Sequence, residues 1–154
     1  MQREQVLSDG QTFTNTDSTG EISTNTIDFE QNAMADDQIS MELILTVISA
    51  TVTSGLTEGL QVSLRTDDAA ALTTARDAAG AGYIDAGTID LLVTDLVAGK
   101  QYSTHCRRDK AKRYAGGWVR AKSTSLVGNV VLDIEIHCCP VNMNEVIQVK
   151  RSSI

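Results

Sequence analysis

The stretch Val127–Pro140 alternates apolar and polar side chains with the two-residue period of a β-strand. The apolar positions, all of one parity, are Val130, Leu132, Ile134, Ile136 and Cys138. The polar positions of the other parity are Asn129, Asp133, Glu135 and His137. A strand with one apolar face is not stable alone, because that face must be covered by another layer. The stretch therefore predicts a layered protein built from β-sheets.

Length and composition favour a single globular domain. The chain has 154 residues, of which 42% are apolar, and a chain of this size can bury a conventional core. No apolar run reaches the roughly 18 residues of a membrane span, and the first residues lack the apolar core of a signal peptide. Three cysteines, two of them adjacent, form no disulfide framework. We therefore expect synthesis in a reducing cytosol and no membrane association.

Further alternating segments predict an antiparallel sandwich or barrel. The additional strands are expected at Ile39–Ser49, Leu60–Arg65, Gln101–Cys106 and Val119–Ser125. The segment Asp67–Ala79 is compatible with either a short helix or β-structure with a loop. We expect an irregular N-terminal arm over residues 1–22, a β-sandwich domain over residues 23–140 and a C-terminal tail over residues 141–154.

Charge is distributed unevenly along the chain. Residues 1–99 carry 16 acidic and 3 basic side chains, whereas residues 100–154 carry 4 acidic and 10 basic ones. The two parts are therefore electrically opposite, although the chain as a whole has a net charge of −7. Such a chain can present complementary surfaces to its neighbours.

Two histidine–cysteine pairs raise the question of metal binding or catalysis. Zinc needs imidazoles and thiolates that converge on one point, but neighbouring residues of a strand point to opposite faces. Ordinary packing of His105–Cys106 and His137–Cys139 is therefore the preferred interpretation, and no orienting group suggests a cysteine nucleophile. Asp36–Asp37 and Asp67–Asp68 lack the spacing of a calcium loop, and we interpret them as turn or cap residues.

A basic run, Arg107–Arg113, could bind phosphates of a nucleic acid. Because the chain is acidic overall and offers few aromatic residues nearby, a solvated loop or a protein contact is favoured. We expect turns or bulges at Gly80–Gly82 and Gly116–Gly117. Trp118 is interpreted as a core anchor, although an aromatic residue beside arginines also suits a protein interface.

Several segments together resemble a known family in order and spacing. They are Leu7–Gln11, Ser23–Asp28, Leu60–Asp68, Asp95–Tyr102, and Lys112–Tyr114 followed by the closing strand to Ile136. Over roughly residues 7–137 the chain resembles the capsid cement (decoration) proteins of tailed phages typified by the Bordetella phage cement protein family. It departs from the family in the charged Arg107–Ala111, where the family is typically proline-rich, and in an apparent insertion at Ala115–Trp118.

The resemblance implies a jelly-roll-like antiparallel β-sandwich with extended N- and C-terminal arms. It implies a structural virion protein, made in the host cytoplasm, that binds the outer surface of the capsid at joints between subunits of the major capsid protein. Such a protein would be a homodimer or homotrimer, would have no enzymatic activity and no cofactor, and would touch neither nucleic acid nor membrane. The expected capsid-contacting residues are Arg107, Arg108, Lys110, Lys112, Arg113, Tyr114, Trp118 and Arg120.

Two rival functions stay open at this point. A virion β-sandwich that binds a receptor or a glycan would require an aromatic-rich cleft, which three tyrosines and one tryptophan barely provide. A zinc hydrolase would have to use His105, His137 and the cysteines, and stoichiometric zinc in the purified protein would support it.

Overall fold

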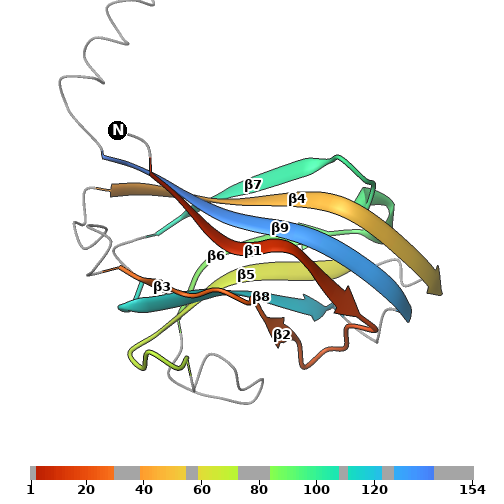
Figure 1. Cartoon of the computed structure of the whole chain (residues 1–154), viewed down its shortest axis with the longest axis horizontal. Helices are drawn as coiled ribbons and strands as arrows, with labels where there is room; N and C mark the ends of the chain where they lie inside the picture. Colours follow the sequence, from red (N-terminus) through yellow and green to blue (C-terminus); the bar gives the residue numbers. More distant parts are fainter. Residues whose placement is uncertain are drawn as a thin grey trace, which may run out of the picture.

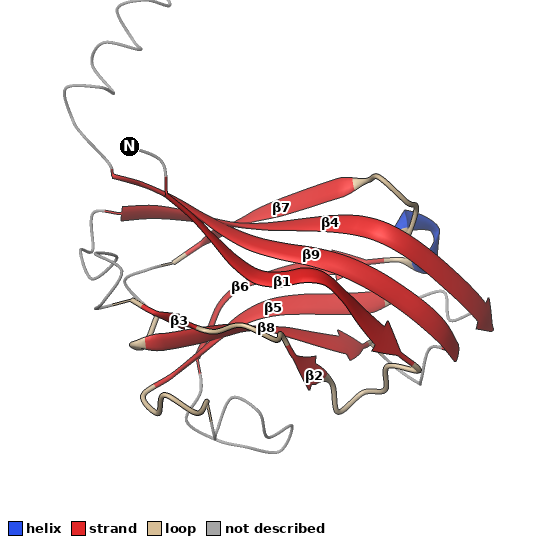
Figure 2. Ribbon diagram, in the orientation of Figure 1, coloured by secondary structure: helices blue, strands red, loops and turns tan. Residues whose placement is uncertain are grey.

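Two antiparallel β-sheets packed face to face make up the part of the chain that can be described (Figure 1). The structure is a computed structural model, and it describes residues 3–29, 39–54, 59–72, 84–107, 111–122 and 127–140. Figure 2 shows that strands dominate these residues, the helical segment being the single 3-10 turn η1 (Val93–Asp95). The predicted antiparallel β-sandwich is therefore confirmed.

Sheet A contains four strands in the order β1-β9-β4-β7. Their bounds are Arg3–Thr14 for β1, Ile39–Ser54 for β4, Gln101–Cys106 for β7 and Val127–Pro140 for β9. The long alternating stretch that begins at Val127 pairs with β1 on one side and with β4 on the other. It therefore lies inside the sheet, where its two neighbours satisfy both edges of its backbone.

Sheet B contains the order β2-β8-β5-β6, and β3 also pairs with β8. The bounds are Glu21–Ile22 for β2, Ile27–Asp28 for β3, Leu60–Asp67 for β5, Ile84–Leu91 for β6 and Tyr114–Ala121 for β8. Both β2 and β3 lie along the same edge of β8, so together they act as one interrupted strand.

The connections follow the jelly-roll pattern of two interlocked Greek keys. Apart from the step from β2 to β3 and the adjacent pair β5 and β6, each successive strand lies in the opposite sheet. The sheets also approach each other at both sides: the backbone N–H of Arg107 donates to the carbonyl of Ala86 at 2.9 Å, and that of Asn25 donates to the carbonyl of Leu7 at 2.9 Å. These contacts reduce the open edges of the sandwich.

The core lies between the sheets and is formed by inward-facing aliphatic side chains of nearly every strand. Its largest fully buried members include Phe13, Phe29, Leu7, Met41, Leu43, Leu45, Leu60, Leu64 and Leu91. The apolar parity of β9 faces this core, since Val130, Leu132, Ile134 and Ile136 are at most 2% exposed. The parity prediction for these four residues is therefore confirmed.

The prediction of an irregular arm over residues 1–22 is wrong for its first part. Arg3–Thr14 forms β1 and pairs with β9 along most of its length. Leu7 and Phe13 are fully buried in the core. The polar composition concealed this strand, because two register shifts between Val6 and Gln11 interrupt its alternation.

Gly116 and Gly117 lie inside strand β8, so the expectation of a turn or bulge there is wrong as well. A Cβ on Gly116 would lie 2.9 Å from Leu72 Cδ1 and 3.0 Å from Ile22 Cδ1. On the opposite face, a Cβ on Gly117 would lie 3.3 Å from two carbon atoms of Ile134. Glycine is therefore used here for close packing on both faces of the sheet rather than for a turn.

Of the ambiguous segment Asp67–Ala79, residues 67–72 contain the end of β5 followed by a turn and no helix. Asp67 Oδ1 accepts a hydrogen bond from the N–H of Ala69 at 3.2 Å, which agrees with its interpretation as a turn residue. Residues 73–79, Gly80–Gly82 and Asp36–Asp37 lie outside the described residues.

Candidate functional site

The first group of predicted contact residues lies where β8 begins. Arg113 and Asp28 form a two-bond pair: Nε of the Arg113 guanidinium donates to Asp28 Oδ1 and Nη2 donates to Oδ2, each at 3.0 Å. The same guanidinium lies over the ring of Tyr114, 4.9 Å from its centroid. Lys112 Nζ donates to Asp68 at 3.0 Å. These cations therefore stabilise the junction of β3, β5 and β8, which reduces their charge available to a partner.

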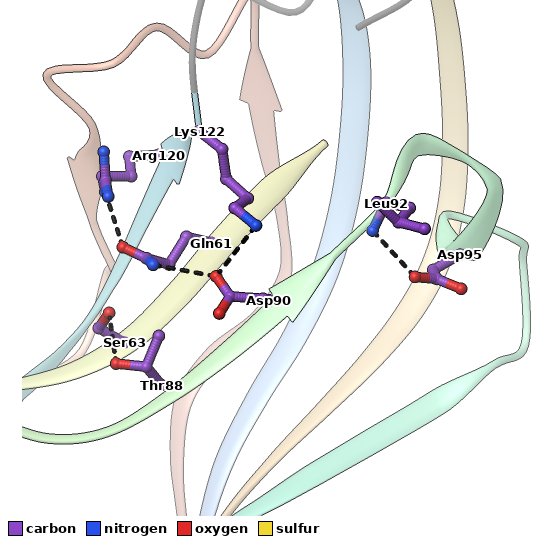
Figure 3. Close-up of polar contacts among 8 residues, drawn as sticks. All are labelled: Gln61, Ser63, Thr88, Asp90, Leu92, Asp95, Arg120 and Lys122. Carbon is purple, nitrogen blue, oxygen red and sulfur yellow. Dashed lines mark hydrogen bonds and ion pairs between the residues drawn. The ribbon is translucent and has the colours of Figure 1, made fainter. Parts of the chain in front are cut away.

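A second group lies at the other end of β8 (Figure 3). Arg120 Nε donates to Gln61 Oε1 at 2.8 Å, and Gln61 Nε2 donates to Asp90 Oδ1 at 2.9 Å. Lys122 Nζ lies 3.6 Å from the same carboxylate oxygen. The result is a polar ladder across three strands of sheet B, in which acidic and basic groups offset each other.

The predicted basic face is thus divided. Arg113 and Arg120 are seven residues apart in sequence, which corresponds to roughly 23 Å along a strand. Arg107 is exposed just after β7, while Arg108 and Lys110 lie outside the described residues. Since β8 separates the two described groups, they do not form one compact patch.

Trp118 is only 3% exposed, so it does not offer its ring to a partner from the surface of one molecule. It lies opposite Ser63 on β5, and the guanidinium carbon of Arg65 lies 4.1 Å from its ring centroid. The backbone of Gly20 packs against its indole edge, where a Cβ would overlap the nitrogen. The interpretation as a packing anchor is confirmed, but the anchor lies on the outer face of sheet B, not in the main core.

Arg65 is a buried cation that sequence reasoning missed. It is 6% exposed and stacks on Trp118, and its Nε lies 3.7 Å from Asp85 Oδ1 on the neighbouring strand β6. In the sequence, Arg65 is one polar position of an alternating strand and nothing distinguishes it from a solvated arginine. Its burial depends on the tryptophan and the covering segments that the fold places above it.

The burial of Asp85 beside Arg65 should make the stability of the protein depend on pH. Burial raises the pKa of Asp85 above its ordinary value of 3.8, while the charges of Arg65 and Arg120 oppose the shift. The folded state therefore holds this proton more tightly than the unfolded state. The resulting stabilisation is fully present below the unfolded-state pKa and is lost as the pH rises through the folded-state pKa.

We expect Asp85→Asn to remove that slope. The free energy of unfolding of the wild type minus that of the variant should fall as the pH rises from about 3.8 and become constant near neutrality, as measured by urea denaturation across the pH range. As a control, Asp90→Asn should leave the slope of the wild type in place. Parallel profiles for wild type and Asp85→Asn would contradict the assignment.

The histidine–cysteine pairs do not converge. His105 and His137 lie on the outer face of sheet A, each opposite Glu42, whereas the thiol of Cys106 is buried on the inner side. Among the described residues, no group of three His, Cys, Asp or Glu side chains is arranged to hold a metal ion. The side chains of Cys138 and Cys139 lie outside the described set.

A shallow polar hollow of about 190 Å³ is formed by the loop after β1. It is lined by Thr14, Asn15, Thr16, Asp17, Thr19, Gly20 and Glu21. Asp17 Oδ1 accepts hydrogen bonds from the hydroxyl of Thr19 and from the N–H groups of Thr19 and Gly20, and these bonds lower its pKa. Because no aromatic side chain lines the hollow, it lacks the ring surface expected of a sugar site.

Comparison with known proteins gives one match over most of the chain. The family model described as Bbp16 matches residues 7–131. No curated protein is matched. The described part of the chain also contains no helix of the length and apolar character that crossing a membrane requires.

Solved structures give distant likenesses. A structure of Bacillus endospore appendages, described as a novel family of disulfide-linked pili, is 12% identical and has a TM-score of 0.37, with 88% of this chain and 85% of that chain covered. The VP2 subviral particle of infectious bursal disease virus is 10% identical and has a TM-score of 0.33, with 90% of this chain and 32% of that chain covered. A structure of the Gx strain of that virus is also 10% identical and has a TM-score of 0.35, with 93% of this chain and 37% of that chain covered. TM-scores of this size establish neither a shared function nor a shared partner.

Proposed function

Because this chain belongs to the Bbp16 family, we propose that it is a capsid cement protein, which binds the outside of a phage head at joints between major capsid protein subunits. The observation that carries the proposal is the extent of the family match, which covers residues 7–131 and nearly coincides with the resemblance to phage cement proteins. In this role the protein performs no catalysis and needs no cofactor. Its work is to hold neighbouring capsid subunits together against the pressure of packaged DNA.

The fold suits such a role through its rigidity. Nearly every strand contributes to one core, and several surface charges are paired across strands, as in Arg113–Asp28 and Lys122–Asp90. A rigid shell loses little conformational entropy when it docks, so moderate contact area can yield useful affinity. Many copies on a lattice then add their contributions.

The contact surface must differ in two respects from the one that the basic residues and the expected N-terminal arm predict. Trp118 is buried and Arg113 is engaged with Asp28, so neither is offered freely to a partner. Residues 3–14 belong to sheet A of their own molecule and therefore do not act as an arm that reaches a neighbour. Exposed Arg107 is the described residue of the basic set best placed for a capsid contact.

Binding to purified heads tests the proposal directly. Heads that lack the protein should take up added protein on their outer surface, visible by negative-stain electron microscopy, and should then resist heating better than bare heads. Arg107→Glu should weaken uptake about tenfold if Arg107 meets an acidic capsid surface. The matched control is Lys100→Glu, which makes the same charge change at another exposed residue and should have a smaller effect.

Failure to bind heads under all salt conditions would reject the cement role, whereas equal binding by both variants would reject only the contact at Arg107. The proposed homodimer or homotrimer is tested separately by sedimentation of the free protein. A monomer at all concentrations would remove self-association from the proposal.

A further inference from the structure

The outer face of sheet A is acidic. The described charged side chains of its strands are four carboxylates, Asp9, Glu42, Asp133 and Glu135. None of the described side chains in these strands is a lysine or arginine. The lysines and arginines whose side chains are described lie instead in sheet B and in the loops and turns. Among the described side chains, the fixed charge of this face therefore has a single sign.

Two histidines are set among these carboxylates by the strand register. Across the full width of sheet A, Glu4 on β1 lies opposite His137 on β9, His137 lies opposite Glu42 on β4, and Glu42 lies opposite His105 on β7. Directly opposed residues of antiparallel strands are near enough for their side chains to interact. His137 Nε2 also lies 2.9 Å from Glu135 Oε2 on its own strand. The row thus alternates carboxylate and imidazole.

The charged groups around each imidazole can be named for every neighbouring strand. Glu42 of β4 faces both histidines, while Glu135 of β9 and the position of Glu4 on β1 face His137 alone. β7 is the edge of its sheet, so no strand of sheet A lies beyond His105. β6 approaches the backbone of β7 at Gly87, a residue without a side chain. The charged residues that the register places opposite the two imidazoles are therefore carboxylates, whereas the cation Arg107 follows His105 by two residues beyond the end of β7.

The same face exposes aliphatic side chains. Val6 is 42% exposed and Ile48 is 45% exposed, and half-buried Ile44 lies in the same cross-strand row as Val6. Glu135 lies opposite Val6 on one side and opposite Ile44 on the other. The face thus offers both negative charge and exposed apolar side chains, the two features that a basic, partly apolar surface would complement.

We propose that this face docks a basic, partly apolar protein surface. Its described carboxylates, Asp9, Glu42, Asp133 and Glu135, offer negative charge to a cationic partner. Val6, Ile44 and Ile48 offer apolar area beside these charges.

A second copy of this chain is the less suitable occupant. In a twofold dimer the face would meet itself, which would place carboxylates against carboxylates. A head-to-tail contact would need a basic surface on the neighbour. Lys112, Arg113 and Lys122 are each paired with an aspartate of their own molecule, and the exposed Lys100 and Arg107 lie at opposite ends of β7. The inference does not require the partner to be a capsid subunit, so it stands apart from the proposed function.

The test uses a synthetic peptide of alternating lysine and leucine, immobilised on a sensor surface, as the probe. Wild-type protein should bind this peptide at neutral pH, because the carboxylates of sheet A attract its lysines. The triple variant Glu42→Gln/Asp133→Asn/Glu135→Gln should bind about tenfold more weakly at neutral pH.

The matched control neutralises three carboxylates elsewhere, as Glu21→Gln/Asp68→Asn/Asp90→Asn, and has the same net charge as the triple variant. Circular dichroism and thermal unfolding confirm that each variant is folded. Equal losses in the two triple variants would overturn the proposal, since overall charge would then explain the binding. Absence of binding by the wild type would also overturn it, as would self-association that the sheet A substitutions abolish.

Discussion

Replacing Phe13 by alanine is expected to lower the free energy of unfolding by about 3–5 kcal/mol. Phe13 is fully buried in the core although it lies in a stretch of polar sequence, and its strand pairs with β9. Truncation removes the ring and leaves a cavity that the surrounding aliphatic side chains cannot fill without moving the backbone. Urea denaturation followed by circular dichroism measures the effect through the shift in the midpoint.

Thr12→Ala is the matched control, because Thr12 is the preceding residue of the same strand and is exposed. It should change the free energy of unfolding by less than about 0.5 kcal/mol. If Phe13→Ala were equally mild, β1 would not be part of the core, and residues 1–22 would behave as the arm that the composition suggests.

A large loss of stability is also expected from Gly128→Ala, of about 3 kcal/mol or more. Gly128 has φ +126°, a conformation that L side chains rarely adopt, and a Cβ there would overlap the carbonyl oxygen of Thr51 on the paired strand β4. The residue also receives a hydrogen bond from Asn15, whose N–H donates to the Gly128 carbonyl at 2.9 Å. An added methyl group must therefore displace backbone on β4, at the start of the strand that organises sheet A.

Gly10→Ala separates backbone strain from steric overlap. Gly10 has φ +59°, but nothing lies within 4 Å of a Cβ at that position. Its substitution should cost about 1–2 kcal/mol, the usual penalty of a left-handed conformation. Thermal unfolding of both variants makes the comparison, and equal destabilisation would show that the overlap with Thr51 is relieved at no cost.

The strands that show a clear two-residue period were predictable from the sequence. The strands in which a register shift or close packing at glycine interrupts that period were not. The closing strand and Ile39–Ser49 were recognised because one parity of each is almost wholly aliphatic. β1 was missed because bulges shift its register, so that Leu7 and Phe13, an even number of residues apart, are joined by a segment without regular alternation. The first part of β8 was missed because its glycines resemble a turn, whereas Leu72, Ile22 and Ile134 require them for packing.

For the candidate contact surfaces, the sequence indicated which residues are charged, but it did not indicate which residues lie next to one another in the fold. The basic run from Arg107 to Arg113 is evident in the sequence, yet its pairing of Arg113 with Asp28 joins residues 85 positions apart. The alternation of carboxylate and imidazole across sheet A likewise appears only when β1, β9, β4 and β7 are placed side by side. The pattern within one strand cannot predict such a row, because each of the four strands contributes only one residue to it.

By itself, the amino-acid sequence determined that this protein is an antiparallel β-sandwich, because side-chain alternation acts within one strand and needs no knowledge of its neighbours. Only the tertiary structure decided which charges are neutralised, which aromatic residue is hidden and which face is left acidic. Those properties depend on strand register, and a shift of one residue would exchange the inner and outer side chains of a whole strand. Register is fixed by contacts between segments far apart in the chain, as Glu42 between His105 and His137 illustrates.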